Sequence, residues 1–279
     1  MLVDEPVHVA ISVSQRFECL NVLLDILKSN FKKKFITHVF CNLCREDLKA
    51  HEDKIDKRLV DFFYHYPDDC KMINDPYKDK STKHKHKRIQ PLKLIKFVFE
   101  TMGNMDDIKK FVYTECDVFP LDERKYLEPY FSIFDPKEII ASHNDLAGRK
   151  TPSGMICPSP LFLTKVASQK IAKKIQIHEQ DNQTSFEGRL MSAIKDADVN
   201  LKQLSENLPN NFFAAMNLDI ITETTHQHNI FNLEKPLKKR KINKGTWINE
   251  IFEKDEIVEL TSGKVMRKDK EFTLEYWMR

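Results

Sequence analysis

Residues 109–120 read KKFVYTECDVFP. The run up to residue 115 is short, largely apolar and rich in aromatic and β-branched side chains, which is typical of a strand buried inside a sheet. It ends in Glu115, Cys116 and Asp117. Because ligands of an open α/β sheet bind outside the carboxyl ends of its strands, this strand should carry two carboxylates to that edge. Carboxylates at a strand end can converge on Mg²⁺ or Mn²⁺, which takes its remaining ligands from substrate phosphates.

Upstream of this strand, short apolar stretches alternate with amphipathic ones. Strands are expected at 7–13, 35–41 and 60–66, and helices from Phe17, at 46–59 and after the polar loop 67–90. Strand and helix alternate with short connections, which predicts an α/β fold: a three-layer α/β/α sandwich with a mostly parallel central sheet.

Downstream of it, the same alternation continues for about ninety residues. Helices are expected at 123–131, 160–175 and 183–195, and strands at 137–142, 153–157 and 199–205. The remainder, 206–279, is mixed, and two short antiparallel strands are expected near 256–274. We therefore predict one domain over 1–232 and a small mixed C-terminal extension over 233–279 packed on it.

The composition excludes several common classes of protein. The chain has 279 residues, of which 41% are apolar, so it can bury a core without disulfides or a structural metal. It has six glycines and contains neither GxGxxG nor GxxxxGK[ST], the two common phosphate-binding loops. The hydrolase motif GxSxG and the zinc-protease motif HExxH are also missing from the sequence.

Positive charge is confined to two short stretches. Of the 45 basic residues, eleven lie in KDKSTKHKHKR (78–88) and KPLKKRK (235–241), and the rest of the chain has 34 basic against 41 acidic residues. Such local basic loops suit a local anion, whereas a nucleic-acid-binding protein more often spreads its charge over a broad face. Solvated loops without a ligand are an equally good interpretation of each run.

The cysteines indicate a reducing compartment, and the hydropathy pattern predicts neither a membrane span nor a signal peptide. The six cysteines lie mostly inside apolar stretches, and CNLC (41–44) has no second CxxC, so a pair at a strand end is favoured over zinc. No apolar run reaches the roughly 18–20 residues that a membrane span needs, and the N-terminus carries acidic residues where a signal peptide has basic ones. We expect a cytoplasmic protein.

The order of these segments, the basic loop KHKHKR and the strand FVYTECDVFP resemble the GT-A-fold glycosyltransferases, which use nucleotide sugars. The resemblance covers about residues 6–230. It implies that 1–120 forms the half that binds nucleotide and metal, and that 121–232 binds the acceptor and the donor sugar. The family's metal motif is Asp-x-Asp or a variant, and Glu115-Cys116-Asp117 departs from it at the first acid.

The resemblance also implies the other site residues. Glu115 and Asp117 would bind Mn²⁺ or Mg²⁺, and a late histidine of THQHN (225–229) would add a ligand; His228 is favoured slightly over His226. The nucleotide and donor sugar would be contacted by Arg16, Lys85, Arg88, Cys116 and Gly154.

An acidic residue at the start of a late helix is the general base of inverting members, and Glu187 has that position. Asp181 and Glu179 are competitors that the sequence does not separate from it, and retaining members need no such base.

The expected function is therefore metal-dependent transfer of a sugar from a nucleoside diphosphate sugar to a hydroxyl of a glycan or another acceptor. Such a reaction requires a divalent ion and cationic side chains, because negative charge develops on the leaving phosphates. The alternative is a non-enzymatic module that binds nucleotide or nucleic acid through 78–88 and 235–241. A related nucleotidyltransferase is disfavoured, since the loop SVSQRFE (12–18) after the first strand has no glycine.

Overall fold

The computed structural model describes residues 5–13, 17–70, 90–116, 118, 120, 123–142, 156, 159–177 and 186–204. The elements follow one another in the order β1 (Val7–Val13), α1 (Phe17–Asp25), the π-helical turn η1 (Ile26–Asn30), β2 (Phe35–Leu43), α2 (Arg45–His51), the 3₁₀ turns η2 (Glu52–Lys54) and η3 (Lys57–Leu59), β3 (Phe62–Cys70), α4 (Gln90–Gly103), β4 (Lys110–Glu115), α5 (Glu123–Phe131), β5 (Glu138–Ser142), β6 (Leu161–Thr164), α6 (Lys165–Lys174), α7 (Phe186–Asp196) and β7 (Asn200–Leu204).

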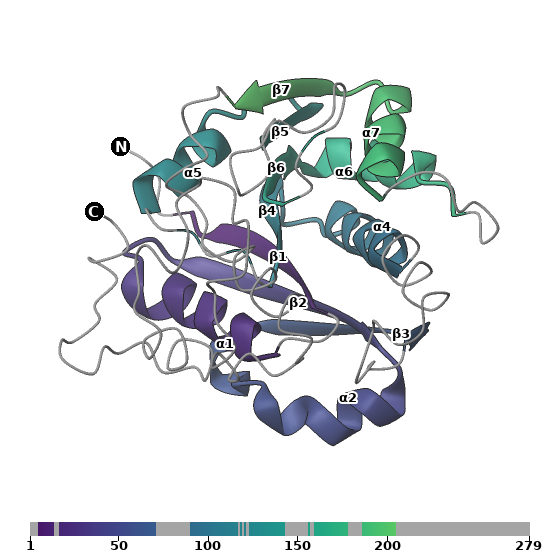
Figure 1. Ribbon diagram of the computed structural model, residues 1–279. Helices are drawn as coiled ribbons and strands as arrows, with labels where there is room; N and C mark the ends of the chain where they lie inside the picture. Colours follow the sequence, from purple (N-terminus) through teal and green to yellow (C-terminus); the bar gives the residue numbers. More distant parts are fainter. Residues whose placement is uncertain are drawn as a thin grey trace, which may run out of the picture.

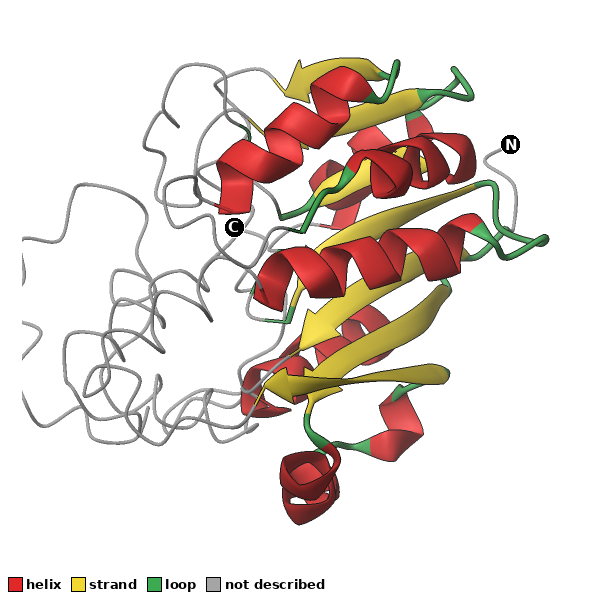
Figure 2. Cartoon of the chain, turned by 90° about the vertical axis from the view of Figure 1, so that its right-hand side faces the viewer, coloured by secondary structure: helices red, strands yellow, loops and turns green. Residues whose placement is uncertain are grey.

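One seven-stranded sheet runs through the described part of the chain, in the order β3-β2-β1-β4-β6-β5-β7 (Figures 1 and 2). Strands β1 to β4 pair in parallel, and β5 pairs in parallel with β7. Only β6 runs the other way, antiparallel to both β4 and β5. The mostly parallel sheet expected from the sequence is thereby confirmed.

Helices cover both faces of the sheet, which gives the three expected layers (Figure 1). On one face, α1 and α5 pack against the odd-numbered residues of β1, and this cluster includes Val9, Ile11, Leu23 and Tyr126. On the other face, α4, α6 and α7 pack over a second cluster that includes Phe99. Residues of β1 alternate between the two clusters because successive side chains of a strand point to opposite faces.

The helix predicted over 46–59 is wrong in its second half, because α2 ends at His51. Asn21 of α1 explains the break. Its Nδ2 donates to Lys54 O at 2.6 Å, and its Oδ1 accepts from Asp56 N at 2.9 Å. A continuous helix would pair those two backbone groups within itself, so the contact with α1 competes with helix and leaves two 3₁₀ turns.

The helix predicted over 160–175 is wrong at its start, where residues Leu161–Thr164 form β6. All four are buried, and β6 is paired on both sides, by β4 and β5. A short apolar run is compatible with either structure by its pattern alone, and pairing on both sides decides for strand. Thr164 then caps α6, because its Oγ1 accepts from Ala167 N at 3.1 Å.

The third expected strand also continues beyond its predicted end. Strand β3 reaches Cys70, so the loop predicted from residue 67 begins later. Of the strand predicted over 153–157, the structure describes Ile156 alone, which is buried. The C-terminal extension 233–279 lies outside the described residues. Within the described residues, the helices are all too short or too polar to cross a membrane.

Candidate functional site

The carboxyl ends of β1, β2, β3 and β4 meet at one edge of the sheet, since these four strands are parallel. The chain proceeds outward from β1 through β2 to β3, and then returns to place β4 on the other side of β1. The strand order reverses between β1 and β4, and this switch point is where open α/β sheets bind their ligands. The strand arrowheads that are visible in Figure 2 point to this side of the sheet.

Glu115 ends β4 at this switch point. It is half-buried and lies in register with Ser12 of β1. The next residue continues the pairing, because Cys116 N donates to Ser12 O at 3.0 Å. The structure therefore places the first acid of the predicted metal motif at the edge where the sequence analysis expected it.

Side chains also hold the backbone of Glu115 on its other flank. Its N–H donates to Ser159 Oγ at 2.8 Å, and Ser159 Oγ lies 3.1 Å from Thr114 Oγ1. Ser159 is 1% exposed and Thr114 has no exposed surface. Sequence reasoning missed both residues. A strand at 161–164 antiparallel to 110–115 would have pointed to Ser159, but that stretch was predicted as helix.

The side chain of Cys116 packs in the core, whereas that of its neighbour Glu115 is only half-buried. The Cys116 side chain is 6% exposed and belongs to the hydrophobic cluster beneath α1 and α5. The predicted nucleotide contact by Cys116 would therefore come from its backbone. The other cysteine motif has a structural explanation, since Cys41 is in the core and burial raises the pKa of its thiol to about 11.

Glu187 lies in the first turn of α7 and is half-buried. The end of α7 leads into β7, whose start pairs with the start of β5. Asp198, between α7 and β7, bonds to Lys137 at 2.8 Å and to Lys170 at 2.9 Å. Since α7 ends at the amino edge of β5 and β7, its first turn points to their carboxyl edge. Both described acids of the predicted site, Glu115 and Glu187, thus lie toward the same edge.

The remaining predicted site residues lie outside the described part of the chain. They are Arg16, Lys85, Arg88, Asp117, Gly154, Glu179, Asp181, His226 and His228. The basic stretches 78–88 and 235–241 lie outside it as well.

The described residues at this edge supply only part of the ligand set that a divalent ion needs. Glu115 offers hard carboxylate oxygens at the switch point, which suits Mg²⁺ or Mn²⁺. Among the described residues there is no cluster of three or more His, Cys, Asp or Glu that could hold a metal ion. Further ligands would have to come from other residues, such as Asp117, or from substrate phosphates, which is the usual mode of magnesium binding.

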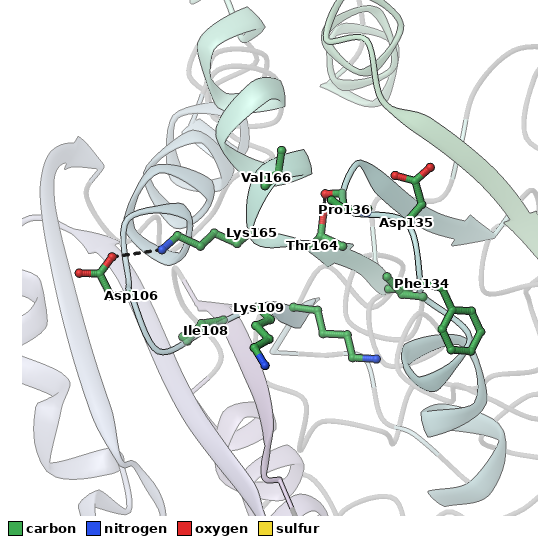
Figure 3. Close-up of a pocket in the computed structure, with 11 residues that line it drawn as sticks. Asp106, Ile108, Lys109, Phe134, Asp135, Pro136, Thr164, Lys165 and Val166 are labelled. Carbon is green, nitrogen blue, oxygen red and sulfur yellow. Dashed lines mark hydrogen bonds and ion pairs between the residues drawn. The ribbon is translucent and has the colours of Figure 1, made fainter. Parts of the chain in front are cut away.

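A cavity of about 460 Å³ lies at the opposite edge of the sheet, near the start of β4 (Figure 3). Its lining includes Lys109, Phe134, Thr164 and Lys165, and Lys165 forms an ion pair with Asp106 at 3.3 Å. Because Thr164 ends the antiparallel strand β6, this cavity is separated from Glu115 by the length of β4. It is not part of the candidate site.

Comparisons with known proteins give likenesses of fold. No family model and no curated protein matches the chain. Mouse xyloside xylosyltransferase 1 in its apo form is similar with a TM-score of 0.41 and 10% identity, over 72% of this chain and 86% of that chain. Galactosyltransferase LgtC, solved with donor and acceptor sugar analogs, gives 0.43 and 11%, over 80% and 82%.

The likeness is not restricted to proteins named as glycosyltransferases. A 4-diphosphocytidyl-2C-methyl-D-erythritol synthase from Anaerococcus prevotii DSM 20548 gives a TM-score of 0.40 and 10% identity, over 72% of this chain and 87% of that chain. Similarity this low concerns the arrangement of helices and strands and carries no argument about chemistry. The solved structures similar to this chain thus include proteins named as sugar transferases and a protein of another name.

Proposed function

We propose that the protein is a metal-dependent glycosyltransferase that moves a sugar from a nucleoside diphosphate sugar to a hydroxyl acceptor. The observation that carries the proposal is the position of Glu115, a half-buried carboxylate at the end of β4 beside β1. This is the switch point of the parallel half of the sheet, where a phosphate-bearing ligand is expected.

In this proposal Glu115, together with Asp117 and a histidine from His226 or His228, binds Mn²⁺ or Mg²⁺. The ion would neutralise charge on the leaving diphosphate. Glu115 serves by presenting a carboxylate oxygen from a rigid strand end rather than from a loop. Arg16, Lys85 and Arg88 are proposed to contact the diphosphate, and Gly154 the donor sugar.

Glu187 is the proposed general base if the enzyme inverts. In the first turn of α7 its carboxylate lies near the positive end of the helix dipole. It would take the proton of the acceptor hydroxyl as that oxygen attacks the sugar. Asp181 and Glu179 remain alternatives for this role, and none is needed if the enzyme retains configuration.

The first test is release of nucleoside diphosphate from a panel of nucleotide sugars, each with an acceptor mixture and with or without Mn²⁺. Glu115→Gln should lower kcat/KM by at least about 100-fold, because it removes a charged metal ligand. Glu128→Gln, an exposed carboxylate on α5, is the matched control and should keep full activity. Full activity of Glu115→Gln in the presence of metal would contradict the proposal.

The same panel separates the competing functions. Release of pyrophosphate from a nucleoside triphosphate and a sugar phosphate would identify a nucleotidyltransferase instead. Salt-dependent binding of DNA or RNA, with no response to any nucleotide sugar, would favour a non-enzymatic binding module.

A further inference from the structure

The hydrogen-bond ladder between β4 and β6 stops before β4 ends. Its register pairs Lys110 with Thr164 and Tyr113 with Leu161. The same register, continued by two residues, places Ser159 opposite Glu115. The Ser159 hydroxyl supplies the missing contact, because its Oγ accepts from Glu115 N at 2.8 Å.

Three hydrogen bonds form a closed ring around the backbone of Glu115. The Thr114 hydroxyl donates to Glu115 O at 3.3 Å. Since a hydroxyl has one proton, the 3.1 Å contact between the two hydroxyls must then be donated by Ser159. Ser159 in turn accepts from Glu115 N. Both the N–H and the C=O of Glu115 are therefore bound by neighbouring hydroxyls.

Two further backbone hydrogen bonds, one of them to β1 on the other side of β4, complete the restraint on Glu115 and its neighbour. Cys116 N donates to Ser12 O of β1 at 3.0 Å, and Val118 N donates to Glu115 O at 3.2 Å. The ring itself is shielded from water, since Thr114 and Ser159 are almost fully buried. Hydrogen bonds in such surroundings meet little competition from solvent and keep their geometry.

We infer that Ser159 is a positioning residue for Glu115. Its hydroxyl closes the ring of three hydrogen bonds, and this ring holds the backbone that presents the Glu115 carboxylate to a divalent cation. The inference rests on the proposed function, because it concerns the same metal site. Loss of a group that orients a metal ligand typically lowers metal affinity by 10–100-fold. Ser159→Ala should weaken Mn²⁺ binding by that factor without removing any ligand.

The test is isothermal titration calorimetry, in which Mn²⁺ is titrated into the full chain. The titration is made without nucleotide and in the presence of UDP, GDP or ADP. Ser159→Ala and Thr114→Val each open the ring, and both should weaken Mn²⁺ binding 10–100-fold at unchanged stoichiometry. Thr114→Ser keeps the hydroxyl and should restore the wild-type affinity. Thr114→Val preserves the shape of the side chain, so it tests the ring even if Ser159→Ala does not fold.

A matched control removes a buried hydroxyl that does not contact Glu115. Tyr113 lies on β4 like Glu115, and Tyr113→Phe breaks its 3.1 Å bond to Ser12 Oγ of β1. It should lower the unfolding midpoint, because a buried hydrogen bond is lost, and should leave the Mn²⁺ affinity unchanged.

Two outcomes would overturn the inference, and they differ in what else they overturn. Wild-type Mn²⁺ affinity in Ser159→Ala and Thr114→Val would leave Ser159 with a structural role alone and would not affect the proposed function. If the wild-type chain bound no Mn²⁺ under any of these conditions, the metal-dependent function and the inference would both be wrong.

Discussion

Glu138 is a carboxylate without exposed surface at the start of β5. It accepts backbone N–H groups from Phe134 at 3.0 Å and Asp135 at 3.1 Å, and it forms an ion pair with Lys202 of β7. Burial alone would raise the pKa of this carboxyl, but the Lys202 ammonium and the two N–H groups outweigh burial and lower it. Its charge therefore stabilises the junction between β5 and β7.

Glu138→Gln should lower the free energy of unfolding by about 1–3 kcal/mol at pH 7, because hydrogen bonds to a charged acceptor are lost. Since the pKa of Glu138 is lower in the folded state, its contribution is present above the ordinary carboxyl pKa and is lost as pH falls. The difference between variant and wild type in urea unfolding should thus shrink below about pH 4.

Lys202→Ala is the informative comparison for this pair. The Lys202 side chain is 61% exposed, but its partner carboxylate has no exposed surface, so removal of the ammonium should cost more than the roughly 1 kcal/mol that is usual for ion pairs in contact with water. An equal cost for both variants would show that the ion pair, rather than the two backbone N–H groups, gives Glu138 its stabilising effect.

At the scale of elements, α1 determines how the segment after α2 folds. Asn21 contacts Lys54 O and Asp56 N, and these bonds hold the two 3₁₀ turns against α1. The turns in turn bring Ile55, which is 6% exposed, into the core beneath α1.

Asn21→Ala should lower the free energy of unfolding by about 1–2 kcal/mol, because two backbone groups lose their partner. Amide hydrogen exchange at Asp56 should become faster, while exchange at the core of β1, for example at Ile11, should change only with global stability. Unchanged protection of the Asp56 amide would show that Asn21 does not hold this segment.

At the scale of the whole molecule, a histidine pair joins the parallel strands. His8 of β1 and His38 of β2 share a hydrogen bond of 3.0 Å between Nδ1 and Nε2, and His38 Nδ1 lies 3.3 Å from Tyr64 Oη of β3. Burial lowers the pKa of His38 to about 4, and the charges of His8 and Lys28 act in the same direction, whereas Asp61 and Asp107 oppose it. Burial also lowers the pKa of His8.

Because these pKa values are lower in the folded state, the unfolded chain binds protons first as pH falls below about 6.5. Stability should be complete above that pH and should decrease by about 2 kcal/mol at pH 5 for His38 alone. His38→Phe keeps an aromatic ring that can stack on Phe62 and Tyr64, as His38 does. Urea unfolding at pH 7.5 and 5.0 should show a weaker pH dependence in this variant, and an undiminished one would exclude His38 as its source.

The elements that could be predicted are those whose local pattern admits a single structure. The strand 7–13 and the helix 123–131 agree with β1 and α5 at both ends. The stretch LFLT, by contrast, fits helix and strand equally, and its antiparallel partners are distant in the sequence. Glu115 could be predicted as a candidate site residue because an acid directly follows an apolar strand, whereas Ser159 is an ordinary serine until its register opposite Glu115 is known.

The sequence by itself determined the alternation of strands and helices, the α/β class and the acid at the end of the central strand, because these depend on periodicity and composition along the chain. Only the tertiary structure decided where α2 ends, that residues 161–164 form a strand and that two hydroxyls bind the backbone of Glu115. Each of those depends on a hydrogen bond between residues more than thirty positions apart. Local preference is too weak to predict such bonds, since tertiary pairing overrides it.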